Sequence, residues 1–173
     1  MKDLLHDKYL LVDTCFLSGA LKYASFFDEL LTLIQRESLG LCIHPLIRLE
    51  LLRFARNESE KERIEALLDE RTRPLRLPEK ILEITEEIYP LYSLCSSVRN
   101  SKQVSITDVC VVSYLREYPN KLMFMTFDNG DYPLELLDRV QTGTVDVESQ
   151  IFTWGLYAYN SEKEKRMQEA FSH

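Results

Sequence analysis

The sequence has few of the residues that build disulfide bonds or zinc sites. Its 173 residues include four cysteines, with no Cys-x-x-Cys pair, and three widely separated histidines. Three of the four cysteines stand in apolar runs, so we expect reduced, mostly buried thiols in a cytosolic protein. Histidine and cysteine ligands that are this scattered argue against a zinc site.

The sequence also lacks an excess of basic residues, a long apolar run and a secretory signal. Lysine and arginine total 21 against 28 aspartate and glutamate residues, which gives a net charge of −7. This argues against a generally basic surface that coats nucleic acid, although acids gathered at a metal site would give the same sign. No apolar run approaches the ~20 residues of a membrane span. We therefore expect a cytoplasmic protein with no membrane partner.

The chain is nevertheless typical of a globular protein. Hydrophobic residues make up 45% and charged residues 28% of the sequence, which excludes a disordered, collagen-like or coiled-coil protein. A length of 173 residues predicts a single domain over 1–173, large enough to fold without disulfide or metal cross-links.

Hydrophobic periodicity predicts strands that alternate with helices. We expect strands at 8–12, 41–43, 75–77, 122–127 and 142–147. We expect helices after Ser25 (with Ser25 and Asp28 as a capping box) and at 46–56, 57–70, 79–97 (kinked or split at Pro90), 108–117, 132–137 and 161–171. This alternation predicts an α/β fold with a mainly parallel sheet.

Two acidic residues follow predicted strands directly. Asp13 ends the first strand and Asp128 ends the strand at 122–127. Ligands of open parallel sheets bind beyond the carboxyl ends of the strands, where a charge next to an apolar run is costly unless something compensates it. A turn residue or a helix cap is the structural alternative for each aspartate.

Two further acids stand on predicted helices beside those strands. Glu50 has Leu46 and Phe54 at i−4 and i+4, which places it on or beside the apolar face. Asp108 opens a helix that is apolar almost all round. The structural alternatives are an exposed glutamate paired with Arg53 and a helix-start aspartate favoured by the helix dipole.

If the four carboxylates meet, their mutual repulsion demands protons or a cation. Two unit charges 4 Å apart repel by ~4 kcal/mol at an effective dielectric constant of 20. Oxygen ligands without histidine or cysteine suit Mg²⁺ or Mn²⁺. Such an ion binds a phosphate oxygen and activates a water for in-line displacement.

Four short motifs in this order resemble the PIN-domain ribonucleases, which include VapC-type toxins. They are Val12-Asp13-Thr14, Leu49-Glu50-Leu51-Leu52-Arg53, Thr107-Asp108-Val109-Cys110 and Thr126-Phe127-Asp128-Asn129-Gly130-Asp131-Tyr132. The resemblance covers about 8–147 and leaves an aromatic and helical extension at 148–173. It implies an α/β/α sandwich around a parallel sheet and metal-dependent cleavage of single-stranded RNA.

By the same resemblance, Asp13, Glu50, Asp108 and Asp128 are the acidic metal-site residues. Relatives place the fourth acid at the position of either Asp128 or Asp131. We favour Asp128 as the ligand because it follows the strand, and Asp131 is then a supporting acid or a helix cap. Cys15 stands where the family often has Asn or Ser. Either Asp108 or Asp128 is a candidate to take a proton from the attacking water.

Two other features bear on partners. The aromatic segment 151–159 is either packed on the core or a surface for RNA bases or a partner subunit, including a second copy of this chain. Arg48, Arg53 and Arg56 on the helix of Glu50, and Arg99 with Lys102 before Asp108, are candidate phosphate contacts, with simple surface charge as the alternative.

The leading hypothesis is a Mg²⁺- or Mn²⁺-dependent endoribonuclease with an RNA substrate and, as a toxin, an antitoxin protein as its partner. One alternative is a PIN-like interaction module without turnover. The other is a phosphohydrolase of the haloacid-dehalogenase type, since Asp13-Thr14-Cys15-Phe16-Leu17 resembles its nucleophile strand. That type expects a second acid two residues after the first, where this chain has Cys15.

Overall fold

The computed structural model describes residues 5–96, 105–128, 130, 132–147 and 150–171, without the side chains at 24–27, 29 and 33. These residues form the predicted α/β fold, built on a mixed and mostly parallel six-stranded sheet in the order β3-β2-β1-β4-β6-β5. In the described part, no helix is both long enough and apolar enough to cross a membrane.

Four short strands form the parallel part of the sheet: β1 (Tyr9–Val12), β2 (Gly40–Ile43), β3 (Thr72–Pro74) and β4 (Leu122–Thr126). β1 pairs in parallel with both β2 and β4, and β2 pairs in parallel with β3. All five residues of β4 are buried, as expected for a strand covered on both faces. Because these strands are parallel, Asp13 and Asp128 follow them at the same edge of the sheet.

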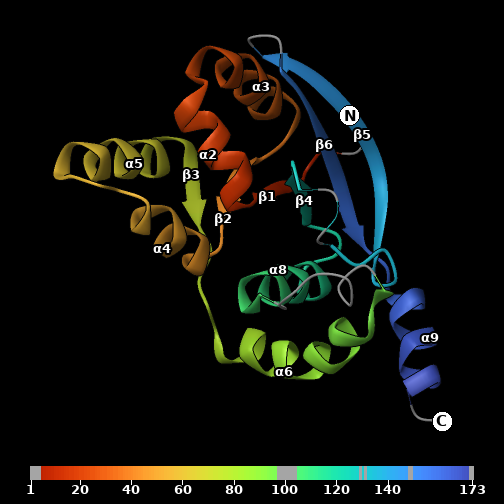
Figure 1. The fold of residues 1–173 in the computed structure, drawn as a ribbon. Helices are drawn as coiled ribbons and strands as arrows, with labels where there is room; N and C mark the ends of the chain where they lie inside the picture. The colour runs from red at the N-terminus through yellow and green to blue at the C-terminus, as the bar shows by residue number, and fades with distance from the viewer. Residues whose placement is uncertain (1–4, 97–104, 129, 131, 148–149, 172–173) are drawn as a thin grey trace.

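Helices cover both faces of the sheet (Figure 1). α2 (Thr14–Lys22) and α3 (Ala24–Glu37) lie on one face, and α6 (Glu79–Leu94) and α8 (Ile106–Glu117) lie on the other. α4 (Pro45–Arg53) and α5 (Glu58–Arg71) lie near β3. The helices α4 and α5 begin at side-chain caps, where His44 Nδ1 accepts from the Leu46 amide and Asn57 Oδ1 accepts from the Glu60 amide.

A long antiparallel hairpin completes the sheet. It consists of β5 (Leu137–Val147) and β6 (Gln150–Tyr159), and β6 lies between β5 and β4. Gly143 faces Trp154 across the hairpin, and a Cβ atom at Gly143 would lie 2.3 Å from Trp154 Cζ2. The indole therefore packs where only glycine leaves room, and it is 8% exposed.

Several predicted elements differ from the observed ones. The aromatic segment 151–159 is an internal strand, with Trp154, Leu156 and Tyr157 in the core, so core packing accounts for most of it. Residues 132–136 form a bend and a turn that lead into β5 at Leu137, and the helix predicted at 132–137 is not present. The predicted strand at 75–77 lies instead at 72–74, and the strand predicted at 142–147 starts at Leu137.

The helix predictions also need correction at three places. α2 had no counterpart among the predicted elements, because its first turn starts immediately after Asp13. α3 begins at Ala24 with Tyr23 as its N-cap, so a capping box at Ser25 is wrong. α6 continues through Pro90 to Leu94 as one helix. The predicted C-terminal helix is confirmed as α9 (Ser161–Phe171).

Candidate functional site

The four predicted acids line one cavity at the carboxyl ends of β1 and β4. This acidic cavity has a volume of about 130 Å³. Its lining consists of the four acids with Thr14, Cys15, Ile47, Thr107 and Tyr132. The structure therefore brings together side chains that are up to 115 positions apart in the sequence, between Asp13 and Asp128. Asp131 lies outside the described residues.

Asp13 is the most deeply buried of the four acids, with 6% of its surface exposed. Its Oδ1 accepts a hydrogen bond of 2.8 Å from the Phe16 amide, which makes it the N-cap of α2. Its Oδ2 accepts a hydrogen bond from the Thr126 hydroxyl. The pKa of Asp13 is raised to about 6, chiefly by burial and to a smaller extent by the negative charge of Asp128, and the hydrogen bonds from Thr126 and the Phe16 amide offset part of this rise. Asp13 therefore caps α2, and it does so at a buried position where ionisation of its carboxyl group is unfavourable.

Glu50 is held by two threonine hydroxyls from other elements. Thr14 Oγ1 donates to Glu50 Oε2 at 2.6 Å, and Thr107 Oγ1 donates to Oε1 at 2.6 Å. These bonds join α4, which carries Glu50, to the first turns of α2 and α8. The half-buried carboxylate is therefore fixed in orientation, and the expected alternative of an ion pair with Arg53 is not observed among the described residues.

Asp108 lies in the first turn of α8 and contacts a buried tyrosine. The Tyr132 hydroxyl donates to Asp108 Oδ1 at 3.2 Å. Burial and the negative charges of Asp13 and Asp108 raise the pKa of Tyr132 well above its usual value. Tyr132 therefore remains a neutral O–H donor at physiological pH.

Asp128 is half-buried on the loop after β4. The Asp128 amide donates to Thr126 Oγ1 at 2.8 Å, and its Oδ1 accepts from the Gly130 amide at 3.3 Å. Thr126 is fully buried, and its hydroxyl contacts both strand-end aspartates. The hydroxyl donates to Asp13 Oδ2 and accepts from the Asp128 amide. One hydroxyl thus links the Asp13 carboxylate to the backbone at Asp128.

Thr107, Thr126 and Tyr132 were not among the site residues predicted from sequence. A signal for two of them was present, because Thr107 directly precedes Asp108 and Thr126 stands two positions before Asp128. Thr14 likewise directly follows Asp13. A threonine within two positions of an acid, at the start of a helix or the end of a strand, therefore predicts a hydroxyl that donates a hydrogen bond to one of the carboxylates.

The acidic cavity suits a hard divalent cation by its chemistry. The four carboxylates offer only oxygen atoms as ligands, which such a cation prefers. Burial and the like charge of Asp128 make Asp13 hard to ionise, and a bound cation would stabilise its charged form. Within the described ranges, no three His, Cys, Asp or Glu side chains are already arranged around one point as metal ligands. The carboxylate oxygens instead accept hydrogen bonds from hydroxyl and amide groups, so an ion would have to compete with these donors.

Arg48 and Arg53 lie on α4, whereas Arg56 lies beyond its end, and all three arginines have partners away from the acidic cavity. Arg48 Nη1 lies 2.8 Å from Asp69 Oδ1, and Arg56 Nη2 lies 2.8 Å from Glu60 Oε1. The Arg53 guanidinium lies 5.3 Å from the centroid of the Phe54 ring. Surface charge accounts for these three arginines, and Arg99 and Lys102 lie outside the described residues.

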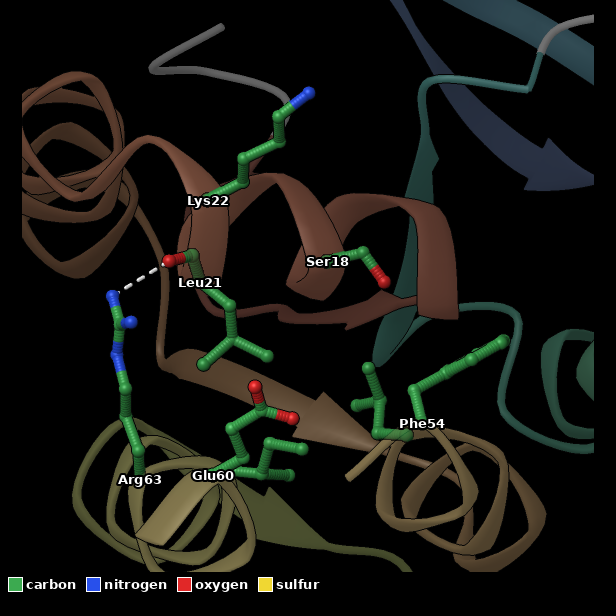
Figure 2. Close-up of a pocket in the computed structure, with 8 residues that line it drawn as sticks. Ser18, Leu21, Lys22, Phe54, Glu60 and Arg63 are labelled. Carbon is green, nitrogen blue, oxygen red and sulfur yellow. Dashed lines mark hydrogen bonds between the residues drawn. The ribbon is translucent and has the colours of Figure 1, made fainter. Parts of the chain in front are cut away.

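A second cavity, shown in Figure 2, lies between α2, α4 and α5 and contains none of the predicted site residues. It has a volume of about 240 Å³ and combines apolar side chains such as Leu51 and Ile64 with charged ones. Arg63 Nη2 donates to the Leu21 carbonyl at 2.7 Å, and Glu60 pairs with Arg56. Its charges thus serve contacts within the protein.

No protein-family model matches this sequence, and no curated protein sequence matches it. A similar solved structure is the crystal structure of VapBC2 from Rickettsia felis bound to a DNA fragment from their promoter. The match has a TM-score of 0.50 and 10% sequence identity, and it covers 68% of this chain and 98% of that chain. At this identity the similarity concerns the fold alone.

Proposed function

We propose that this protein is a metal-dependent endoribonuclease of the PIN-domain, VapC-like type that cleaves single-stranded RNA. The observation that carries the proposal is the acidic cavity, in which Asp13, Glu50, Asp108 and Asp128 from four separate segments meet at the carboxyl ends of the parallel strands. The fold similarity to a VapBC2 chain supports the same type of protein.

Asp13, Glu50, Asp108 and Asp128 would hold one or two Mg²⁺ or Mn²⁺ ions. The ion, when bound, neutralises charge on a phosphate group and lowers the pKa of a water molecule. Four carboxylates from this chain supply the opposite charge, and the desolvated Asp13 gains most from a cation because burial raises its pKa to about 6.

The remaining groups of the site orient the acids. Thr14 and Thr107 fix both oxygens of Glu50, and Thr126 links the Asp13 carboxylate to the backbone amide of Asp128. Asp108 and Asp128 are half-buried, so water reaches them, and each is a candidate to accept a proton from the attacking water. Tyr132, as a neutral donor, holds Oδ1 of Asp108.

We further propose that the nuclease is the toxin of a toxin–antitoxin pair, with a cognate antitoxin protein as its partner. The support is that the similar solved structure is a VapBC2 complex bound to a DNA fragment from the promoter. Co-expression with a candidate antitoxin protein, followed by co-purification, tests this part separately from the chemistry.

The decisive experiment compares Asp13→Asn with the wild type on an unstructured RNA in the presence of Mn²⁺. We expect the substitution to reduce the cleavage rate by about 10³-fold, which corresponds to ~4 kcal/mol of transition-state stabilisation. Asp146→Asn, on an exposed position of β5, is the matched control and should cleave like the wild type. Equal cleavage by Asp13→Asn and the wild type would refute the assignment.

An interaction module without turnover is the second candidate. The observation that favours it is that the described carboxylates accept hydrogen bonds from the protein's own hydroxyl and amide groups and are not arranged around an ion. Calorimetric titration with Mn²⁺ separates the two: the nuclease predicts saturable binding that Asp13→Asn weakens. No heat of binding at millimolar Mn²⁺ would favour the module.

A further inference from the structure

A third cavity adjoins the acidic cavity and is not used by the proposed chemistry. This aromatic cavity has a volume of about 330 Å³ and lies between α2 and the start of β6. Its lining residues are Cys15, Ser18, Gly19, Lys22, Tyr23, Phe127, Gln150 and Phe152. Cys15 lines both cavities, and Phe127 directly precedes Asp128, so the two cavities are neighbours.

Three aromatic rings from different elements meet in the aromatic cavity. The ring centroids of Phe127 and Phe152 are 5.9 Å apart at an interplanar angle of 67°, and those of Tyr23 and Phe152 are 5.5 Å apart at 59°. Phe16, which is fully buried, stacks on Phe127 at 5.6 Å and holds it from the core side. Tyr23, Phe127 and Phe152 are only partly buried, so ring surface is available to a ligand.

Polar groups stand at the same cavity and restrict what fits. The Tyr23 hydroxyl donates to Gln150 Oε1 at 3.0 Å, which ties the end of α2 to β6. Lys22 Nζ lies 4.8 Å from the centroid of the Tyr23 ring and brings a positive charge to the cavity. A flat apolar ligand that carries a negative group satisfies both features, and a nucleotide has this chemistry.

We propose that the aromatic cavity binds one nucleobase of the RNA substrate next to the phosphodiester that lies in the acidic cavity. The inference rests on the proposed function and adds a substrate subsite to it. The volume lies at the lower end of the ~300–1,000 Å³ of small-molecule sites, which suits a single nucleoside. Stacking on aromatic rings accepts any base, so the subsite positions the strand without reading its sequence.

The test measures binding separately from cleavage. A 12-nucleotide oligouridylate and the same strand with one abasic nucleotide, moved along the chain in a series, are titrated with the wild type and with Phe152→Ala. The titrations contain Ca²⁺ in place of Mn²⁺, so that an ion with a preference for oxygen ligands offsets the charge of the carboxylates. We expect one abasic position to weaken wild-type binding by about 5- to 100-fold. Phe152→Ala should bind the intact strand about as weakly as the wild type binds the strand with that abasic position. The affinity of Phe152→Ala should then be the same with and without the abasic nucleotide.

Two further variants guard against a mere loss of folding. Phe152→Tyr keeps the ring and should retain most of the affinity. Ile151→Ala changes the neighbouring residue, which is 72% exposed, and should bind like the wild type. An unchanged affinity of a folded Phe152→Ala for the intact strand overturns the subsite.

The outcomes distinguish the subsite from the nuclease. If Mn²⁺ supports cleavage and Phe152→Ala has wild-type affinity and KM, the subsite is refuted and the nuclease stands. If no cleavage occurs but one abasic position weakens binding only when Phe152 is present, the nuclease is refuted and the subsite stands. If the wild type neither binds nor cleaves the strand, both are refuted.

Discussion

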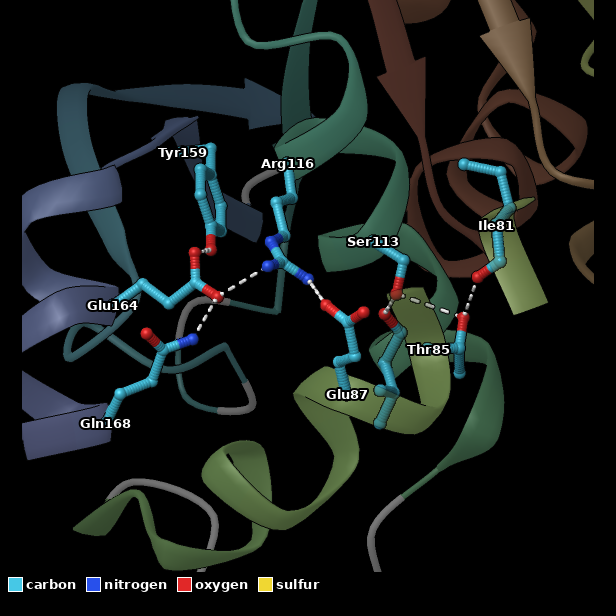
Figure 3. A network of polar contacts seen from close by, with 9 residues as sticks. Ile81, Thr85, Glu87, Ser113, Arg116, Tyr159, Glu164 and Gln168 are labelled. Atoms are coloured by element: carbon cyan, nitrogen blue, oxygen red, sulfur yellow. Dashed lines mark hydrogen bonds and ion pairs between the residues drawn. The ribbon is translucent and has the colours of Figure 1, made fainter. Parts of the chain in front are cut away.

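The protein buries acidic side chains in two regions and compensates them differently. Glu164 of α9 is 7% exposed, and its Oε1 lies 3.0 Å from Arg116 Nη2, while its Oε2 accepts from the Tyr159 hydroxyl. Figure 3 shows this Arg116 network, in which Glu87 and Gln168 also take part. In the acidic cavity, Asp13 is equally buried, but its described partners are a hydroxyl and a backbone amide.

The difference separates an acid with a structural ion pair from the acid that we propose to be a metal ligand. A guanidinium offsets the burial of Glu164 by charge and joins α9 to α8 and, through Glu87, to α6. Neutral donors offset the burial of Asp13 only in part, which is why its pKa is raised to about 6. A buried carboxylate that lacks a cation among its described neighbours favours binding one, and this is the physical basis of the proposed metal site.

Arg116→Met should have the largest effect, and it tests whether Arg116 compensates the buried charge of Glu164. The substitution leaves the buried Glu164 without its cation, and we expect a loss of about 2–4 kcal/mol in the free energy of unfolding. For a chain of this length that lowers the melting temperature by roughly 5–15 °C. Thermal unfolding followed by circular dichroism measures it.

Two controls sharpen this test. Adding Glu164→Gln to Arg116→Met should restore part of the stability, because it removes the uncompensated charge. Lys165→Met breaks an exposed pair with Glu162 and should cost less than about 1 kcal/mol. A melting temperature of Arg116→Met within a degree of the wild type would mean that the network is not structural.

On the functional side, Asp13→Asn should stabilise the metal-free protein at neutral pH. The folded pKa of about 6 is above the unfolded value of 3.8, so the folded state binds the proton more tightly. Protonated Asp13 therefore contributes to the free energy of unfolding below pH 3.8, and this contribution is lost as the pH rises through 6. Asparagine keeps the capping oxygen without the charge, and the gain at pH 8 is at most about 3 kcal/mol.

Denaturant unfolding of both proteins in EDTA, at pH 8 and near pH 4, measures this difference. The advantage of Asp13→Asn should be largest at pH 8 and should shrink toward pH 4. Mn²⁺ should raise the stability of the wild type more than that of the variant, because the ion binds the folded state. A variant less stable than the wild type at both pH values would contradict the account.

The smallest expected effect concerns the hydroxyls that orient Glu50. Thr107→Val removes one hydrogen bond to Glu50 at nearly constant shape, and we expect the affinity for Mn²⁺ to fall about 10- to 100-fold. Calorimetric titration measures this affinity. Thr107→Ser should keep it, and Thr144→Val, at an exposed position of β5, should leave it unchanged. Full affinity in Thr107→Val would show that Glu50 needs no such support.

The parallel strands and most of the helices were predictable because their signals are local. β1, β2 and β4 are short apolar runs, and α5 has Asn57 as its cap and charged residues throughout. The place of β6 was not predictable, because its pairing with β4 is antiparallel and brings together residues about 30 positions apart. Its aromatic residues fit a surface and a core equally well when only the sequence is considered.

The sequence by itself determined which residue types are available for chemistry: four acids next to apolar runs, each of three with a threonine within two positions, and few histidines or cysteines. Only the tertiary structure decided that Asp13, Glu50, Asp108 and Asp128 share one cavity, while Glu164 faces a guanidinium. The reason is that periodicity fixes the face of an element on which a side chain lies, whereas sheet order and helix packing fix what that face meets.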